Sequence, residues 1–119
     1  MELTNIKMTN YLDSLCKISR KAKGKLGYAV ARNIRKISDE LVEYENIKND
    51  HIRKHGEKTE NGDYVIHKDT DAFVAFLKDM QEFAYISHDV DIYMIDAEEI
   101  EKSDLTADEI LNIEFMIAE

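Results

Sequence analysis

Two histidines have the spacing of paired metal ligands. His51 and His55 lie four residues apart in a segment with helical periodicity, so both side chains would project from one face of a helix. Neither the glutamate of a metalloprotease helix nor a cysteine accompanies them. Two histidines near the end of a helix are more often exposed to water than bound to metal. We therefore expect no metal ligand and no cofactor at this position.

A second set of residues has the order of the ligands in HD-type metallophosphohydrolases. His88 and Asp89 are adjacent, His51 lies upstream, and Asp104 or Asp108 lies downstream. That class holds its ligands on several helices of a larger helical domain. Here His88 and Asp89 fall at a predicted helix-to-strand junction, where such residues are ordinary turn formers. The sequence therefore favours a structural role for both.

The one cysteine, Cys16, lies on the predicted apolar face of the first helix, which favours a buried structural thiol over a nucleophile. The chain has no glycine-rich phosphate loop and no nucleophile elbow. With no catalytic constellation in the sequence, we expect that this protein is not an enzyme.

The basic N-terminal third is the feature with the most functional content. The formal net charge is −9, yet the acidic residues before Ile37 are only Glu2 and Asp13. A basic cluster could neutralise nucleic-acid phosphates, but Tyr28 is the only ring within it and the acidic remainder would oppose such an approach. The alternative is that it pairs with an acidic part of the same chain or of a second subunit. The candidate binding surface comprises Lys17, Arg20, Lys21, Lys23, Lys25, Arg32, Arg35 and Lys36.

A long helix from Leu26 to His55 is predicted to organise the chain. Its apolar positions step by three and four residues, as one face of a helix requires. The opposite face, which includes Arg32, Asn33 and Lys36, is expected to lie in water. We expect the C-terminal helices to cover the apolar seam, with a second copy of the chain as the alternative. The seam comprises Val30, Ile34, Ile37, Leu41 and Tyr44.

Shorter elements are predicted on both sides of this helix. They are a leading strand at 3–8, a first helix from Thr9 or Asn10 to Gly24, a type I′ hairpin at Asn61-Gly62, a helix capped by Asp69 or Thr70, a strand at 90–95 and a buried last helix opened by the capping box Thr106–Glu109. Together they predict a single domain, 1–119, with a mostly helical α+β fold. The long central helix would pack with the N- and C-terminal helices, beside a small antiparallel sheet built from the hairpin and the 90–95 strand.

Composition indicates the compartment. Hydrophobic residues make up 44% and charged residues 34%, which is ordinary for a folded protein and argues against disorder. One cysteine excludes a disulfide within the chain. The sequence has no apolar run of membrane-spanning length, and its first residues lack the pattern of a signal peptide. We therefore expect a cytoplasmic protein with no membrane partner.

Six segments of the chain carry a resemblance to known proteins: 10–15, 28–36, the region of Tyr44, the helix end at His55-Gly56, 105–111 and 115–117. In these segments the chain resembles a family of small phage and prophage proteins of Gram-positive bacteria, the DUF1617-like proteins. The resemblance implies a phage-type protein in the cytoplasm of a bacterial host, without enzymatic activity and without assigned catalytic residues. We expect an accessory protein that acts by binding another protein, of host or phage, or a second copy of itself. Nucleic-acid binding through the basic N-terminal helices is the alternative.

Overall fold

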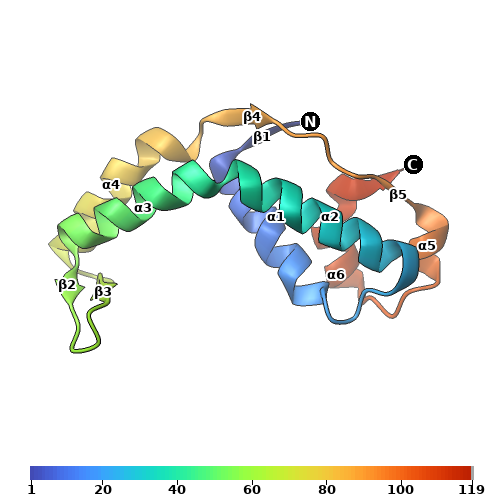
Figure 1. The fold of residues 1–119 in the computed structure, drawn as a ribbon, viewed down its shortest axis with the longest axis horizontal. Helices are drawn as coiled ribbons and strands as arrows, with labels where there is room; N and C mark the ends of the chain where they lie inside the picture. The colour runs from blue at the N-terminus through green and yellow to red at the C-terminus, as the bar shows by residue number, and fades with distance from the viewer. Residues whose placement is uncertain (119) are drawn as a thin grey trace.

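Helices make up most of the computed structural model, which describes residues 1–118 (Figure 1). The helices are α1 (Asn5–Ile18), α2 (Gly24–Glu40), α3 (Val42–His55), α4 (Asp71–Ala84), α5 (Ala97–Glu101) and α6 (Ala107–Asn112), with a 3-10 turn η1 at Glu114–Met116. The strands are β1 (Glu2–Thr4), β2 (Glu57–Lys58), β3 (Tyr64–Val65), β4 (Ser87–Asp89), β5 (Ile95–Asp96) and β6 (Ile117–Ala118). The predicted fold class, mostly helical α+β, is confirmed.

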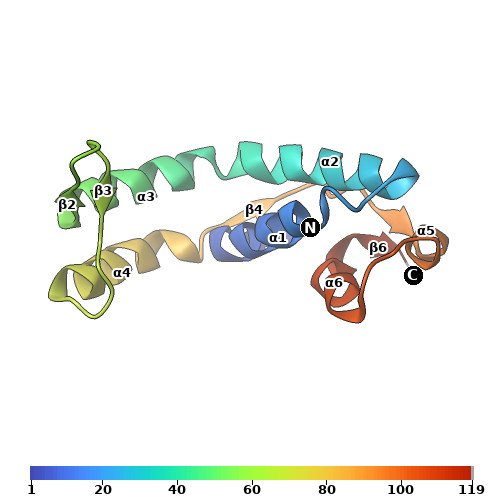
Figure 2. The same ribbon diagram turned by 90° about the horizontal axis from the view of Figure 1, so that it is seen from below.

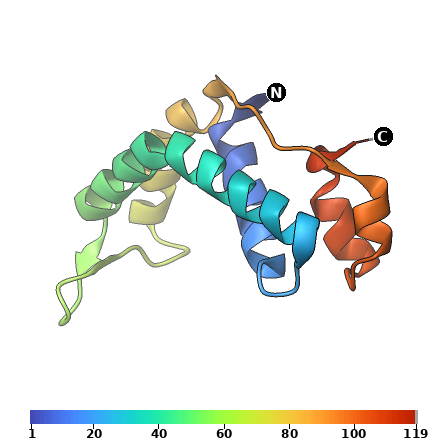
Figure 3. The same cartoon turned by 45° about the vertical axis from the view of Figure 1, so that its right-hand side comes forward.

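The molecule consists of a body and a projecting arm. The arm, residues 42–84, contains α3 and α4 side by side and the β2–β3 hairpin at the tip (Figure 2). The body contains α1, α2 and the C-terminal segment, which runs from β5 to β6. These elements lie together at the end of the molecule opposite the arm (Figure 3). The extents are 48 × 30 × 22 Å and the radius of gyration is 17.0 Å. A compact chain of this length would have a radius of about 13.5 Å, so the arm makes the molecule distinctly elongated.

The predicted central helix is interrupted at Leu41. The structure has two helices end to end, and Figure 1 shows the bend where they meet. The N–H of Leu41 donates to the carbonyls of both Ile37 and Ser38, and its ψ of −5° departs from helical geometry. The Leu41 side chain is buried in the body core. Burial of this side chain fixes the bend at the base of the arm.

Two different parts of the chain pack on the apolar seam. Within the body, the buried part of α2 packs with α1 and with the C-terminal segment, as predicted. Beyond Leu41 the C-terminal helices do not cover the seam, so that expectation is wrong. There α3 packs on α4 instead and has no buried residue. The body core includes Met8, Leu15, Ile18, Val30, Ile37, Leu41, Ile113 and Met116.

The N-terminal elements differ from the prediction. The leading strand stops at Thr4, whose side chain accepts a hydrogen bond from the Lys7 N–H and caps α1. The cap is therefore earlier than Thr9 or Asn10. The helix also ends at Ile18 rather than at Gly24, which instead begins α2 with a positive φ of 59°. A connection between two helices near Gly24 is confirmed, but residues 19–23 form it.

Gly27 lies where this connection passes close to α2. A Cβ atom at position 27 would lie 2.8 Å from the Ala22 carbonyl oxygen. On an open helix, Gly→Ala would stabilise by about 1 kcal/mol. At this site we expect Gly27→Ala to destabilise the fold, by about 1–3 kcal/mol. Chemical denaturation gives the sign directly, and a stabilised variant would contradict the close approach.

The strands form three separate two-stranded sheets rather than one. β1 pairs antiparallel with β4, β2 antiparallel with β3, and β5 parallel with β6. Residues 90–94 are irregular: of the three apolar residues expected to alternate inward, Val90 and Ile92 are buried but Met94 is exposed. The hairpin forms, but only Gly62 has a positive φ, so the turn is not type I′.

The last helix begins as predicted and ends early. Thr106 and Glu109 form the capping box, but α6 has six residues and none is buried. The core residues of this segment, Ile113 and Met116, come after it. The expectation of a long buried C-terminal helix is therefore wrong.

Glu109 also links α6 to residues 19–23, the connection between α1 and α2. Its Oε1 atom lies 2.7 Å from Lys21 Nζ and accepts from the Thr106 N–H at 2.9 Å. The hydrogen bond from Lys21, and then that from Thr106, lower the Glu109 pKa from its ordinary value of 4.5. The ionised form is thus preferred on folding, so its stabilisation is present above pH 4.5 and lost as pH falls through the lowered folded-state pKa.

The lowered pKa of Glu109 predicts how the stability of a Glu109→Gln variant depends on pH. We expect the variant to be less stable than the parent at pH 7, and the gap to close as the solution is acidified below the carboxyl pKa. Thermal unfolding of both proteins across this pH range measures the gap. A gap that stays constant with pH would show that ionisation of Glu109 contributes nothing.

Candidate functional site

An exposed patch of aromatic and basic side chains lies where α2 meets the irregular segment 90–94. Tyr28 and Tyr93 pack edge to face, with ring centroids 5.5 Å apart. The guanidinium carbon of Arg32 lies 5.6 Å from both centroids, within cation–π range. Arg32 Nη1 also donates to the Tyr28 hydroxyl at 3.2 Å. These contacts hold three large exposed side chains in one arrangement.

Asn33 fixes the backbone of Tyr93 and so positions its ring. The Asn33 side chain is fully buried, which corrects the expectation that it lies in water. Its Nδ2 donates to the Tyr93 carbonyl at 2.9 Å, and its Oδ1 accepts from the Tyr93 N–H at 2.8 Å. Both backbone groups of Tyr93 are thereby satisfied although the segment belongs to no sheet.

Lys36 anchors the same segment one helical turn further along α2. Its Nζ donates to the Asp91 carbonyl at 2.6 Å and lies 3.7 Å from the Asp91 carboxylate. With Asn33 it holds the segment along α2 at two points. The position of Tyr93 is therefore set by two α2 side chains, one of them in the core.

Shallow depressions lie on both sides of Tyr28. One, of about 320 Å³, is lined by Tyr28, Ala31, Arg32, Arg35 and Lys36. The other, of about 280 Å³, includes Lys25, Tyr93 and Met94 in its lining. Tyr28 is 54% and Met94 45% exposed. We call the set Tyr28, Arg32, Arg35, Tyr93 and Met94 the aromatic–basic patch.

The structure divides the predicted binding surface. Its α2 members, Lys25, Arg32, Arg35 and Lys36, line these depressions. Those before α2 lie apart from the depressions, and two of them are engaged: Lys17 pairs with Asp13 and Lys21 with Glu109. Pairing with the chain's own acidic residues thus accounts for Lys17, Lys21 and Lys36. Within residues 1–118 no ion pair is made by Arg20, Lys23, Lys25 or Arg35.

Tyr93 and Met94 are the patch residues that the sequence does not indicate. They lie about 60 residues from α2 in the chain, and their segment was predicted as a strand. The available signal is the buried asparagine: Asn33 lies one residue before Ile34 of the apolar seam, so its amide could have been expected to bond a neighbouring backbone.

Three other candidates from the sequence have surroundings that differ from those expected. Cys16 is exposed rather than buried. His88 contacts the Asn5 amide at 3.1 Å and lies 3.5 Å from Glu40, so its neighbours are not the HD-type ligands. His51 and His55 face α4 and are partly buried, whereas exposed side chains were expected.

The comparisons with known proteins identify no class. No family model, no curated protein and no solved structure matches this chain. In the part of the chain that the structure describes, no helix combines the length and the apolar character needed to cross a membrane.

Proposed function

We propose that this protein acts by binding another protein, without catalysis, and that the aromatic–basic patch is its contact surface. The observation that carries the proposal is the Arg32 guanidinium held against two exposed tyrosine rings. Tyrosine, arginine and methionine are enriched in the cores of protein interfaces, and tyrosine and arginine dominate binding energies. Side chains already fixed by neighbours lose little entropy on binding.

The charges define the chemistry of the partner. Arg35 and Lys25 flank Tyr28 and have no carboxylate partner within residues 1–118. Two depressions beside Tyr28 offer room for an apolar or aromatic side chain. The partner surface is therefore a protein segment that presents carboxylates around at least one large apolar side chain. The phage-type accessory role in a bacterial cytoplasm, implied by the sequence resemblance, belongs to the same proposal.

Nucleic-acid binding is the second candidate, and one observation favours it. The sequence placed a single ring, Tyr28, in the basic cluster, whereas the fold adds Tyr93 beside it. Two rings with arginines resemble a platform for stacked bases. Their planes, however, are 76° apart and Arg32 lies over both. The two rings therefore offer no pair of parallel faces on which successive bases could stack.

Fluorescence anisotropy with two labelled probes separates these candidates. One probe is a peptide of alternating glutamate and tyrosine, and the other is a single-stranded DNA oligonucleotide of equal length. We expect the peptide to bind and the DNA to bind more weakly at physiological salt. DNA binding that exceeds peptide binding and falls steeply with salt would overturn protein binding in favour of the second candidate.

A further inference from the structure

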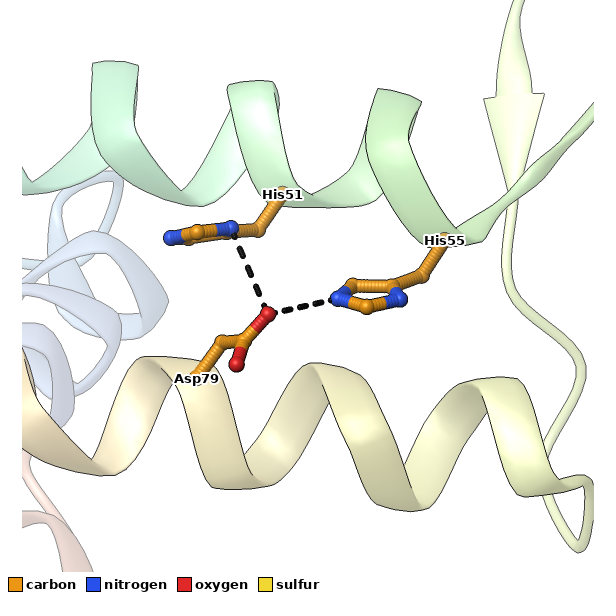
Figure 4. A group of neighbouring side chains, drawn as sticks. All are labelled: His51, His55 and Asp79. Carbon is orange, nitrogen blue, oxygen red and sulfur yellow. Dashed lines mark hydrogen bonds and ion pairs between the residues drawn. The ribbon is translucent and has the colours of Figure 1, made fainter.

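Three side chains of the arm converge on one point between its two helices (Figure 4). His51 and His55 project from successive turns of α3, and Asp79 reaches them from α4. His55 Nε2 lies 2.6 Å from Asp79 Oδ2, and His51 Nδ1 lies 3.8 Å from the same oxygen. One potential ligand atom from each residue falls within 4.8 Å of the other two.

The three side chains are partly withdrawn from water. The exposed fraction is 16% for His55, 23% for His51 and 32% for Asp79. The Phe83 ring lies 6.2 Å from the His51 ring. The cluster therefore presents a carboxylate and two imidazoles, all partly buried, between α3 and α4.

A purely structural role for Asp79 explains only part of this arrangement. Asp79 bonds His55 and lies 3.4 Å from Lys54, which would suffice to tie α4 to α3. His51, at 3.8 Å, is beyond hydrogen-bond range of the carboxylate. Its imidazole nevertheless faces the same oxygen instead of turning to water (Figure 4). This third group distinguishes a ligand set from a simple helix bridge.

We propose that His51, His55 and Asp79 bind a divalent transition-metal ion, with zinc as the best match. Two imidazole nitrogens and one carboxylate oxygen are ligands that zinc takes, in sites where three protein ligands leave a fourth position open. Tetrahedral bonds of about 2.0–2.2 Å place ligand atoms roughly 3.3 Å apart. The distances of 2.6 and 3.8 Å lie on either side of that value, and all three ligand atoms lie within 4.8 Å of one another, so side-chain rotations would be needed to complete the geometry.

Metal at this site would act on the arm rather than on the patch. α3 has no buried residue, and α4 buries only Met80 and Ala84. A metal bridge between the two helices would add a link that the apolar contact alone provides weakly. The open coordination position would accept water or a donor atom from a molecule bound at the arm. The proposal does not depend on the binding function of the patch.

Zinc titration of the untagged, metal-free protein by calorimetry, with thermal unfolding as a second readout, tests this site. We expect one zinc ion per chain and a higher unfolding temperature with zinc. Loss of a residue that only hydrogen-bonds to a metal ligand costs roughly 10-fold to 100-fold in affinity. His51→Gln and Asp79→Asn each remove a ligand itself, so each should weaken zinc binding by more than that. The control His67→Gln, at an exposed histidine between β3 and α4, should bind like the parent.

Substitutions of His51 and Lys54 distinguish a metal site from a simple helix bridge. His51→Gln removes no hydrogen bond to Asp79, so the metal-free variant should fold like the parent, as circular dichroism will show. Lys54→Gln removes a competing cation whose side chain is 63% exposed, and should tighten zinc binding. Absence of stoichiometric zinc, or zinc binding that is unchanged in His51→Gln, would overturn the proposal and leave Asp79 as a helix bridge.

Discussion

Replacement of Asn33 by alanine is expected to lower the free energy of unfolding by about 2–4 kcal/mol. The side chain is fully buried and satisfies both the N–H and the carbonyl of Tyr93, 60 residues away. Its removal leaves two partly buried backbone groups without partners and opens a cavity beside Met116, whose sulfur lies 3.6 Å from Asn33 Nδ2. Chemical denaturation gives the change in free energy.

Asn46→Ala is the matched control, because Asn46 is an exposed asparagine within α3. Both substitutions gain the same intrinsic helix propensity, so the difference between them measures the loss of the buried side chain, its hydrogen bonds together with its packing. The control should change stability by no more than about 0.5 kcal/mol. Equal effects of the two substitutions would show that the Asn33–Tyr93 contacts contribute no net stability.

The same substitution should also impair binding without altering a surface charge. With the Tyr93 backbone released, its ring is no longer held beside Tyr28 and Arg32. We therefore expect Asn33→Ala to bind the glutamate–tyrosine peptide more weakly at a temperature where the variant remains folded.

The second large effect is expected from reversing two charges of the patch. Arg32→Glu combined with Arg35→Glu should weaken binding of the acidic peptide by about 100-fold or more, since each change removes an attraction and adds a repulsion. Both side chains are exposed and neither contributes to the buried core, so the unfolding temperature should stay within a few degrees of the parent's. Anisotropy titrations supply the ratio of affinities.

Lys17→Glu combined with Arg20→Glu is the matched control for charge. It makes the same change in net charge on another exposed part of the basic N-terminal third. A long-range electrostatic effect would weaken binding equally in both double variants. A contact surface at the patch predicts a loss only in the Arg32 and Arg35 variant.

The accurate predictions came from local signals in the chain. The Thr106–Glu109 capping box, the Thr70 cap and the positive φ of Gly62 were predictable because each depends on residues within one turn of the chain. The apolar period also located α2 and α4. These features need no knowledge of which segments meet in space.

Features set by distant contacts were missed. The bend at Leu41 follows from packing of one side chain in the body, which helical periodicity does not encode. The strands are two or three residues long, too short for alternation to reveal, and β1 pairs with β4 from the other end of the chain. Cys16 was placed on the wrong face because the buried stripe of the first helix runs through Met8, Leu15 and Ile18.

The aspartate of the metal cluster had a weak signal in the sequence. Asp79 lies three residues after Phe76 and four before Phe83, so a carboxylate interrupts the face of α4 that packs on α3. A charge in such a position needs a partner across the helix contact. Only the pairing of α3 with α4, which no residue pattern specifies, shows that the partners are His51 and His55.

Photo-crosslinking from position 28 tests the central claim most directly. A photoreactive phenylalanine derivative at Tyr28 places the reactive group between the two depressions of the patch, in lysate of cells that produce the chain. We predict an adduct that protease destroys and nuclease does not, absent in the Arg32→Glu, Arg35→Glu variant and retained in the Lys17→Glu, Arg20→Glu variant. A nuclease-sensitive adduct, or a protein adduct indifferent to these charges, would contradict protein binding through the aromatic–basic patch.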